Sequence, residues 1–392
     1  DYFDAFNNFQ FYVGLRYDYF DYDFKKMIDP TAPEKTIVFQ SGELISSGLI
    51  DIESSSFISP KAAIKFQMLK NLGFIANYSQ NVQSHPYSNI YEGIYSLGRK
   101  LRAWNQIFSN VQDSKPIVNK SIEIGVEFSP LTNLSLKMIY FNKTFNNIQR
   151  QELQRTVSGS PYQSYIFLSN NGRMDANGLE FLLDYCFRGI TIRSILSIQK
   201  AKEYVNYYSL IADGTDFIDY GINSPRINQI NFNTLLVYDF SSLNNISDIF
   251  NELNFSLLFN YNDGHSFVNI IYENSGVRNG QRYIVQDCTP SILNIDLKIE
   301  KNFIISNDLN LDVYLYAVNL FDNQNIYNVF SNTGKSDDDG YNLALYQQMF
   351  GEEKGAKMYQ LHQLELSYNP AGGQQIFYGP PRQIGFGIKL NY

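Results

Sequence analysis

Residues able to move a proton or attack a bond are few in this 392-residue chain. Its 3 histidines are His85, His265 and His362, and histidine is the usual general base near neutral pH. A hydrolase would need a histidine within hydrogen-bond reach of a nucleophile, and His265 with Ser266 is the pairing that the sequence offers. The chain contains no glycine-rich phosphate loop, CxxC pair or HExxH motif. We therefore expect neither an enzyme nor a bound cofactor.

The acidic run Asp337, Asp338 and Asp339 is the candidate metal site. Clustered carboxylate oxygens suit a hard cation such as calcium. The run lacks the spaced ligands and the closing glutamate of an EF-hand loop. A solvated acidic loop is the simpler interpretation, and a calcium site is the alternative.

A second set of charged residues lies at alternate positions within otherwise apolar segments. Alternation places these charges on one face of a strand, opposite the apolar face. In a barrel with a wet interior this face lines the lumen, where the charges would hydrate it and contact a passing solute. The candidates are Arg16, Asp18, Lys61, Lys65, Glu123, Glu127, Asp296, Lys298 and Glu300. The formal net charge of -8 argues against a nucleic-acid partner.

The segments that carry these charges have the period of a β-strand. About twelve segments of roughly ten residues alternate between apolar and polar positions along the chain. Ile122, Ile124 and Val126, for example, alternate with Glu123 and Glu127. No apolar stretch approaches the ~18 residues that a membrane helix needs. The pattern therefore predicts an all-β fold, a transmembrane antiparallel β-barrel.

The end of the chain, residues 382–392 (RQIGFGIKLNY), shows this alternation without a fault. An exposed apolar edge strand is an aggregation hazard, and closing the sheet into a barrel removes the edge. If the apolar face points to lipid and the polar and glycine face points to water, a tilted strand of this length crosses a bilayer. We therefore expect a protein of the outer membrane, with lipid as its first partner.

The connections between the expected strands alternate between short and long. The short ones are 70–71, 130–133, 187–189, 241–251 and 304–310, and the long ones are 24–58, 84–120, 150–173, 204–224, 264–290 and 323–381. Outer-membrane barrels place tight turns on the periplasmic side and long loops outside, whereas a soluble sandwich has no reason to sort its loops. In the last long loop Tyr341, Tyr346, Phe350 and Tyr359 are candidates for contact with a ligand or partner. Packing of the loops on one another is the alternative.

Two stretches resemble a known family. Residues 319–341 (NLFDNQNIYNVFSNTGKSDDDGY) and 378–384 (YGPPRQI) resemble the C-terminal strands of TonB-dependent outer-membrane receptors. They resemble most closely the Oar-like branch, which has an N-terminal carboxypeptidase-regulatory-like domain. Weaker similarity covers 177–185 and 294–303, and the first half of the chain fits by pattern only. Tyr392 resembles the terminal aromatic signal that the barrel-assembly machinery recognises.

The resemblance implies a barrel of about 22 strands that is plugged by an N-terminal domain. Residues 1–392 would then be the C-terminal part of that barrel, with the plug and other N-terminal domains absent. The intact receptor would take up or release a large solute, gated by the plug and driven by the TonB complex through the absent N-terminal part. The lumen charges would also contact the plug.

Two alternatives remain open at this point. The chain could be a complete barrel of about twelve strands that acts as a passive channel or translocator. It could also be a structural barrel within a larger outer-membrane assembly, with loops that bind partner proteins.

Overall fold

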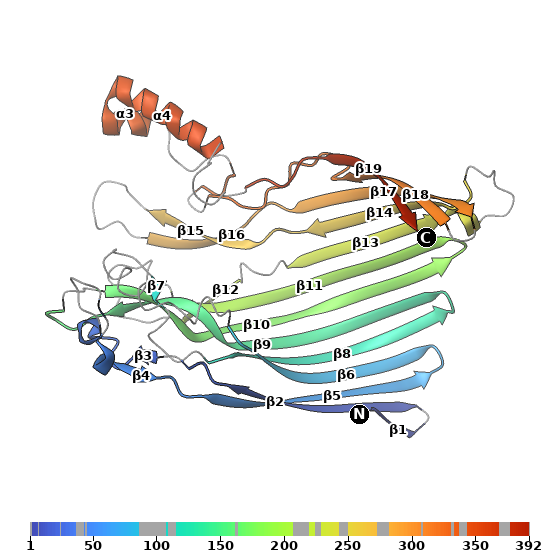
Figure 1. The fold of residues 1–392 in the computed structure, drawn as a ribbon, viewed down its shortest axis with the longest axis horizontal. Coiled ribbons are helices and arrows are strands. Elements are labelled where there is room, and N and C mark those ends of the chain that lie inside the picture. The colour runs from blue at the N-terminus through green and yellow to red at the C-terminus, as the bar shows by residue number, and fades with distance from the viewer. Residues whose placement is uncertain are drawn as a thin grey trace. The chain divides into compact units, whose positions relative to one another are not determined.

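Long strands dominate the structure of this chain, which is a computed structural model (Figure 1). It describes residues 2–6, 8–23, 25–36, 43, 45–85, 107–108, 115–160, 164–206, 219–223, 229–242, 250–272, 282–306, 309–330, 333–336, 343–367 and 377–391. Within these residues, none of the helices is both long enough and apolar enough to span a membrane.

The main sheet has 15 strands, and most of them are hydrogen-bonded in the order in which they follow one another along the chain. That linear order is β1 (Tyr2–Phe6), β2 (Phe9–Phe20), β5 (Ser55–Leu69), β6 (Leu72–Gln83), β8 (Ile117–Leu131), β9 (Leu134–Arg155), β10 (Ser164–Phe187), β11 (Ile190–Asn206), β13 (Ile230–Asp239), β14 (Leu253–Asn262), β17 (Ile292–Ser306), β18 (Leu309–Val318) and β19 (Gln383–Asn391).

Shorter strands lie in the connections. β7 (Ile107–Phe108) pairs with β10, and β12 (Asp219–Asn223) pairs with β11. Two separate hairpins are formed by β3 (Lys25–Met27) with β4 (Leu49–Asp51), and by β15 (Ser266–Tyr272) with β16 (Arg282–Cys288).

Every strand predicted from alternation coincides with a strand of this order, so the nearly all-β fold is confirmed. β1 is an additional strand that alternation did not predict, and it pairs with β2. The strands are also longer than predicted: β9 has 22 residues and β10 has 24. The connection predicted over 150–173 is therefore wrong in extent, because these two strands continue past Arg150 and begin before Arg173.

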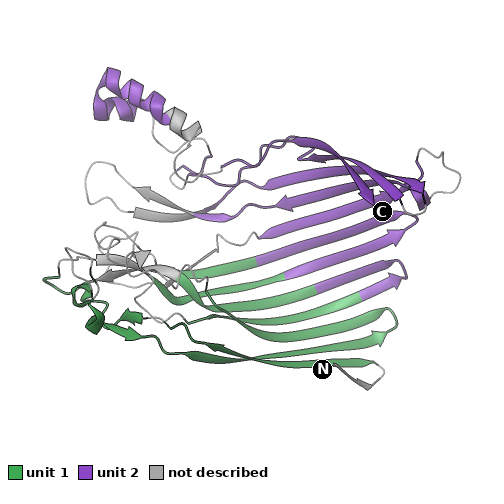
Figure 2. Cartoon of the chain, viewed as in Figure 1, with its two compact units in different colours: residues 1–127, 139–178, 200–223 green, residues 128–138, 179–199, 224–392 purple. Residues whose placement is uncertain are grey.

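The chain divides into two compact units, which Figure 2 shows in different colours. Unit 1 comprises Asp1–Glu127, Ile139–Gly178 and Lys200–Asn223. Unit 2 comprises Phe128–Met138, Leu179–Gln199 and Ser224–Tyr392.

The apolar face of the strands is exposed in each unit. In unit 1, Leu15 of β2 is 75% exposed, and Val13 and Tyr17 on the same face are also largely exposed. In unit 2, Phe386 of β19 is 78% exposed, together with its neighbour on that face, Ile388. A water-soluble protein would bury such a face, whereas a membrane strand turns it to lipid.

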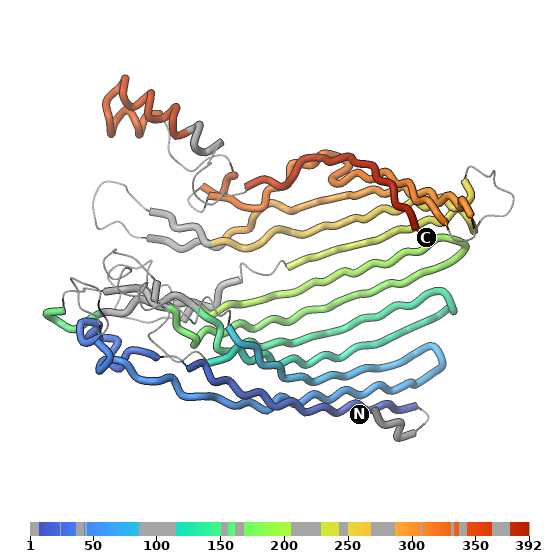
Figure 3. The backbone as a smooth tube through the Cα atoms, in the orientation of Figure 1, coloured from blue at the N-terminus to red at the C-terminus, as the bar shows by residue number. Residues whose placement is uncertain are grey.

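Tight turns and long connections are sorted to opposite strand ends within each unit, as predicted. Figure 3 shows the turn between β5 and β6 at one end of unit 1 and the long connection between β2 and β5 at the other. In unit 2, the turn between β17 and β18 and the long connection between β18 and β19 are separated in the same way.

The last long connection is not simply a loop. It contains two helices, α3 (Leu343–Phe350) and α4 (Glu352–Ser367), which pack against each other. Gly351 joins them with a φ of 85°, a backbone conformation that glycine adopts without steric cost. Alternation of period two carries no signal for such a hairpin, so the sequence indicated only a long loop here.

A positive charge on the apolar face should destabilise the barrel, whereas the same charge on the polar face should be tolerated. Leu15→Arg places a guanidinium among lipid near the middle of β2, where it costs about 2–4 kcal/mol. Ala63→Arg is the matched control, because Ala63 pairs with Tyr12 on the polar face. Urea unfolding from lipid vesicles should show the loss for Leu15→Arg only, and equal losses would contradict the assignment of the faces.

Candidate functional site

The polar face of unit 1 brings together six of the predicted lumen residues. In the register of β2 with β5, Lys61 and Lys65 oppose even-numbered positions of β2 and so share a face with Arg16 and Asp18. Glu123 and Glu127 of β8 reach the same face, because each contacts a side chain of that face.

Oppositely charged side chains are paired across this face. The pairs are Arg16 with Asp18 (2.6 Å, Nη2 to Oδ1), Lys65 with Glu127 (2.7 Å, Nζ to Oε2) and Lys143 with Glu123 (3.9 Å, Nζ to Oε1). All three pairs are partly exposed, so each contributes only ~0–1 kcal/mol to stability. Such a surface holds water and compensates charge. It does not set a general acid beside a general base.

Three polar atoms of this face are buried without a hydrogen-bond partner among the described residues. They are Asp18 Oδ2, Ser59 Oγ and Asn119 Oδ1. Ser59 pairs in register with Arg16, next to Asp18, so two of the three atoms lie close together on neighbouring strands. Buried polar atoms normally have a partner, and these three have none within the part of the chain that the structure describes.

The polar face of unit 2 holds Asp296, Lys298 and Glu300 at alternate positions of β17. Lys298 Nζ lies 2.6 Å from Glu300 Oε2. Asp296 Oδ1 accepts a hydrogen bond of 2.8 Å from the backbone N–H of Asn319, which follows the end of β18. Asp296 is therefore engaged in holding a turn, a role that alternation did not indicate.

Asparagines join β17, β18 and the start of β19. Asn319 is 1% exposed, and its Nδ2 donates to the carbonyls of Asn323 (2.9 Å) and Pro380 (3.2 Å). Asn325 accepts from the N–H of Leu293 (2.9 Å) and donates to Asn294 Oδ1 (2.6 Å). The two stretches that carry the family resemblance thus contact each other, through a backbone bridge between Ile326 and Tyr378 among other contacts.

Two tyrosines of β18 cover two glycines of β19 on the polar face. Tyr316 pairs in register with Gly385, and Tyr314 pairs with Gly387. A Cβ placed on Gly385 would lie 2.5 Å from Cζ and Oη of Tyr316, and a Cβ on Gly387 would clash with Tyr314 in the same way. The glycines are therefore required because the rings lie against the backbone of β19.

The aromatic candidates of the last connection lie in the α3–α4 hairpin. The ring of Tyr346 lies 5.9 Å from that of Phe350, 5.8 Å from that of Tyr359 and 5.4 Å from that of His362. This mutual packing favours the structural interpretation of these residues over a ligand platform. The described residues do not include Tyr341, Asp337, Asp338, Asp339 and Tyr392.

Among the described residues, His265 contacts Thr289 and not Ser266, with which it was predicted to pair. His85 is buried, its Nε2 lies 2.9 Å from the carbonyl oxygen of Lys115, and burial lowers its pKa. His265 Nδ1 lies 3.3 Å from Thr289 Oγ1, while Ser266 Oγ lies 3.8 Å from Cys288 Sγ. In the part of the chain that is described, no three His, Cys, Asp or Glu side chains are arranged to hold a metal ion.

The described residues of the connection between β2 and β5, which are 21–23, 25–36, 43 and 45–54, form a compact cap that sequence reasoning missed. Met27, Ala32 and Thr36 are almost fully buried within it. Its two short 3-10 helices are η1 (Pro33–Lys35) and η2 (Ser46–Gly48), and Thr36 Oγ1 donates to the carbonyl of Gly48 at 3.1 Å. A third 3-10 helix, η3 (Phe240–Ser242), lies outside the cap and follows β13 in unit 2.

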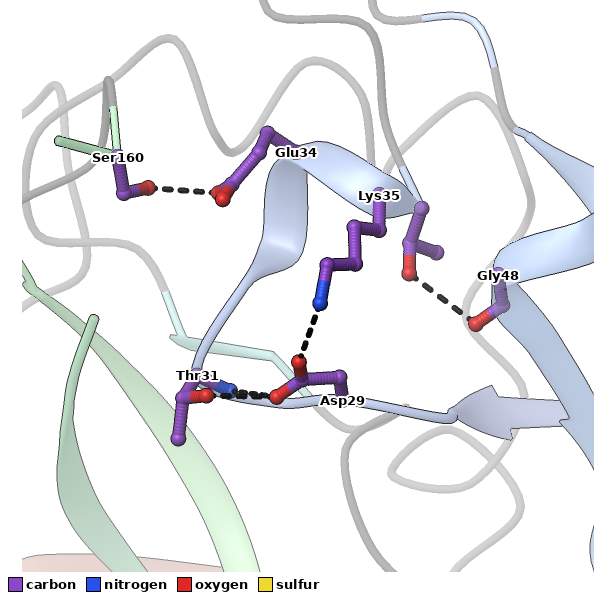
Figure 4. A network of polar contacts seen from close by, with 7 residues as sticks. Asp29, Thr31, Glu34, Lys35, Gly48 and Ser160 are labelled. Carbon is purple, nitrogen blue, oxygen red and sulfur yellow. Dashed lines mark hydrogen bonds and ion pairs between the residues drawn. The ribbon is translucent and has the colours of Figure 1, made fainter. Parts of the chain in front are cut away.

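Polar contacts hold the cap to the connection between β9 and β10, as Figure 4 shows. Ser160 Oγ donates to Glu34 Oε2 at 2.6 Å, and the N–H of Val157 donates to the carbonyl of Thr31 at 2.9 Å. Asp29 accepts from Thr31 Oγ1 (2.6 Å) and from Lys35 Nζ (2.9 Å). These hydrogen bonds, that of Thr31 foremost, lower the pKa of Asp29 from 3.8 to about 2.

Comparison with protein families gives one match. The profile of the family described as TonB dependent receptor-like, beta-barrel, matches residues 1–233. The match includes the first half of the chain, which only the alternation pattern had supported. It leaves out residues 319–341 and 378–384, which carried most of the resemblance. No curated protein matches the chain in sequence.

Solved structures with a similar fold are outer-membrane transporters and receptors. The copper transporter OprC has a TM-score of 0.54 at 12% identity, over 100% of this chain and 46% of that chain. The ferripyoverdine receptor of the outer membrane of Pseudomonas aeruginosa has a TM-score of 0.51 at 12% identity, over 84% and 34%. The FrpB iron transporter from Neisseria meningitidis has a TM-score of 0.45 at 16% identity, over 81% and 38%. The chain thus spans less than half the length of each, and the similarity to the first two, at identities this low, shows a shared fold alone.

Acid should loosen the cap between pH 4 and pH 2, roughly. Because the folded-state pKa of Asp29 is about 2 and its ordinary value is 3.8, its stabilising effect is complete above ~4 and is lost as the pH falls through ~2. Hydrogen exchange should show falling protection factors for the cap over this interval. In Asp29→Asn the protection should be lower at pH 7 and should not fall over this interval, and an unchanged pH profile would contradict the assignment.

Gly385→Ala should destabilise the last hairpin, because its methyl group would overlap Tyr316. Overpacking of this kind costs about 1–3 kcal/mol. The double variant Gly385→Ala/Tyr316→Ala should lose less stability than the sum of the two single variants, since the overlap is removed. Urea unfolding in lipid vesicles measures both, and additive losses would argue against the ring contact.

Proposed function

Because the chain belongs to the TonB dependent receptor-like beta-barrel family, we propose that it is the barrel part of an outer-membrane receptor that transports a large solute. Proteins of this family lie in the outer membrane, and they are transport receptors and not enzymes. The observation that carries the proposal is the division of the strands into an exposed apolar face and a face of paired charges. A lipid-facing surface and a hydrated lumen are what such a receptor needs.

Residues 1–392 are proposed to be the C-terminal part of a barrel of about 22 strands. The linear strand order, with β1 and β19 at its two ends, supports this proposal. The chain spans 34% to 46% of the solved receptors and transporters described above, and this agrees with a partial barrel. Assignment to the Oar-like branch rests on residues 319–341 and 378–384 and remains part of the proposal.

A plug domain of the same protein is the proposed partner of the polar face. Partly exposed carboxylates such as Glu127 lie on this face, and a plug offers them donors in its backbone N–H groups, lysines and arginines. The paired charges around them would keep the contact hydrated and reversible, because exposed ion pairs exchange readily with water. The same plug would couple the barrel to the TonB complex.

Transport should depend on TonB. In cells that carry the intact receptor, deletion of the receptor gene and deletion of tonB should abolish accumulation of the same solutes from a complex medium, as measured by mass spectrometry of the cells. Both deletions should act alike because a plugged barrel opens only when TonB pulls on it.

The two other functions predict different outcomes of this experiment. A passive channel would lose accumulation on deletion of the receptor gene but not of tonB. A structural barrel would change accumulation in neither deletion, and a stable partner protein would copurify with the intact receptor. Either result would overturn the proposed function.

A further inference from the structure

The polar face of β17, β18 and β19 carries an ordered set of side chains. A wall that only had to be hydrated would not need this order. In the register of these strands, Lys298 pairs with Tyr316, and Tyr316 pairs with Gly385. At the next position on this face, two residues along each strand, Glu300 pairs with Tyr314, and Tyr314 pairs with Gly387. The result is two rows in which a charge, an aromatic ring and a glycine stand side by side.

The ring of Tyr316 presents an open surface. The far end of the ring, at Cζ and Oη, lies close to the backbone of β19, because Gly385 has no side chain to hold it away. The ring of Tyr314 is 6.4 Å away, and the ammonium of Lys298 lies over it at 5.0 Å from its centre. Tyr316 has no such cover among the described residues and is 38% exposed.

Hydrogen-bonding groups lie on the same face as this ring. Lys298 and Glu300 form an ion pair of 2.6 Å in the neighbouring strand. Further along the face, Asp312 accepts hydrogen bonds from Asn302 Nδ2 (2.5 Å) and Asn391 Nδ2 (2.6 Å). An apolar ring bordered by fixed donors and acceptors is typical of a ligand site, in which the ring supplies contact area and the polar groups supply orientation.

The charges of this face favour a ligand without negative charge. Its carboxylates are Asp296, Glu300 and Asp312, and its ammonium groups are Lys298 and Lys389, which makes three negative and two positive charges and a local net charge of -1. This balance gives an anionic ligand no advantage, while a neutral ligand that carries hydroxyl groups could bond to both members of the Lys298–Glu300 pair.

We propose that Tyr316 is the stacking platform of a binding site for a neutral hydroxyl-bearing ring, the sugar ring of an oligosaccharide. The apolar C–H face of the sugar would lie on the open face of Tyr316, and its hydroxyl groups would bond to Lys298 and Glu300. The proposal rests on the proposed transport function, since it names the class of solute that passes along this wall.

Binding to the intact receptor in detergent tests the site. Isothermal titration with maltohexaose, cellohexaose, xylohexaose and inulin as neutral probes, and with 2,3-dihydroxybenzoate as an anionic aromatic probe, should show binding of at least one neutral probe only. Tyr316→Leu keeps apolar cover over Gly385 but lacks a flat ring, and it should weaken that binding at least about 10-fold. Tyr316→Phe keeps the ring and should weaken it less than about 3-fold.

The control variant is Tyr17→Leu, which removes a tyrosine ring from the apolar face of β2 and should leave binding unchanged. Near-ultraviolet circular dichroism and urea unfolding would show that each variant is folded. The proposal is overturned if none of the neutral probes binds, if only 2,3-dihydroxybenzoate binds, or if Tyr316→Leu binds as tightly as the unmodified receptor. Because binding is measured without energisation, its failure is distinct from loss of TonB dependence in cells.

Discussion

The structure depends on one constraint, which is that every backbone N–H and C=O inside a bilayer needs a partner. Water is absent there, so antiparallel pairing between neighbouring strands has to supply these hydrogen bonds. The residue-by-residue register of β2 with β5, and of β17 with β18, meets this demand. Pairing then fixes the side chains, because successive residues of a paired strand point to opposite faces. The exposed Leu15 and the paired Lys65 are two consequences of the same backbone arrangement.

The two faces solve different problems. On the apolar face, side chains such as Phe386 gain by contact with lipid and need no specific partner. On the polar face, each charge must be compensated or hydrated, and the pairs Lys65 with Glu127 and Lys298 with Glu300 do this at little gain in stability. The glycines of β19 also serve the polar face, since they leave room for the far ends of the Tyr314 and Tyr316 rings beside the strand.

Outside the paired strands the chain uses side chains to complete its hydrogen bonds. Asp29 and Thr36 hold the cap together through side-chain hydrogen bonds, and Glu34 joins it to Ser160. At the other connection Asn319 and Asn325 satisfy backbone groups of Asn323, Pro380 and Leu293. Asparagine suits this task because its amide both donates and accepts, and because it tolerates the positive φ of 52° that Asn319 adopts.

The sequence by itself determined the strands, their two faces and the sorting of short and long connections. These follow from a period of two, which is a local property that each segment expresses without knowledge of its neighbours. The same period also located the charges of the polar face, from Arg16 to Glu300. Only the tertiary structure decided which charges pair, why Gly385 is a glycine, and that the described part of the β2–β5 connection forms a cap joined to the β9–β10 connection. Those features depend on contacts between residues far apart in the chain, such as Glu34 with Ser160, and no local pattern encodes them.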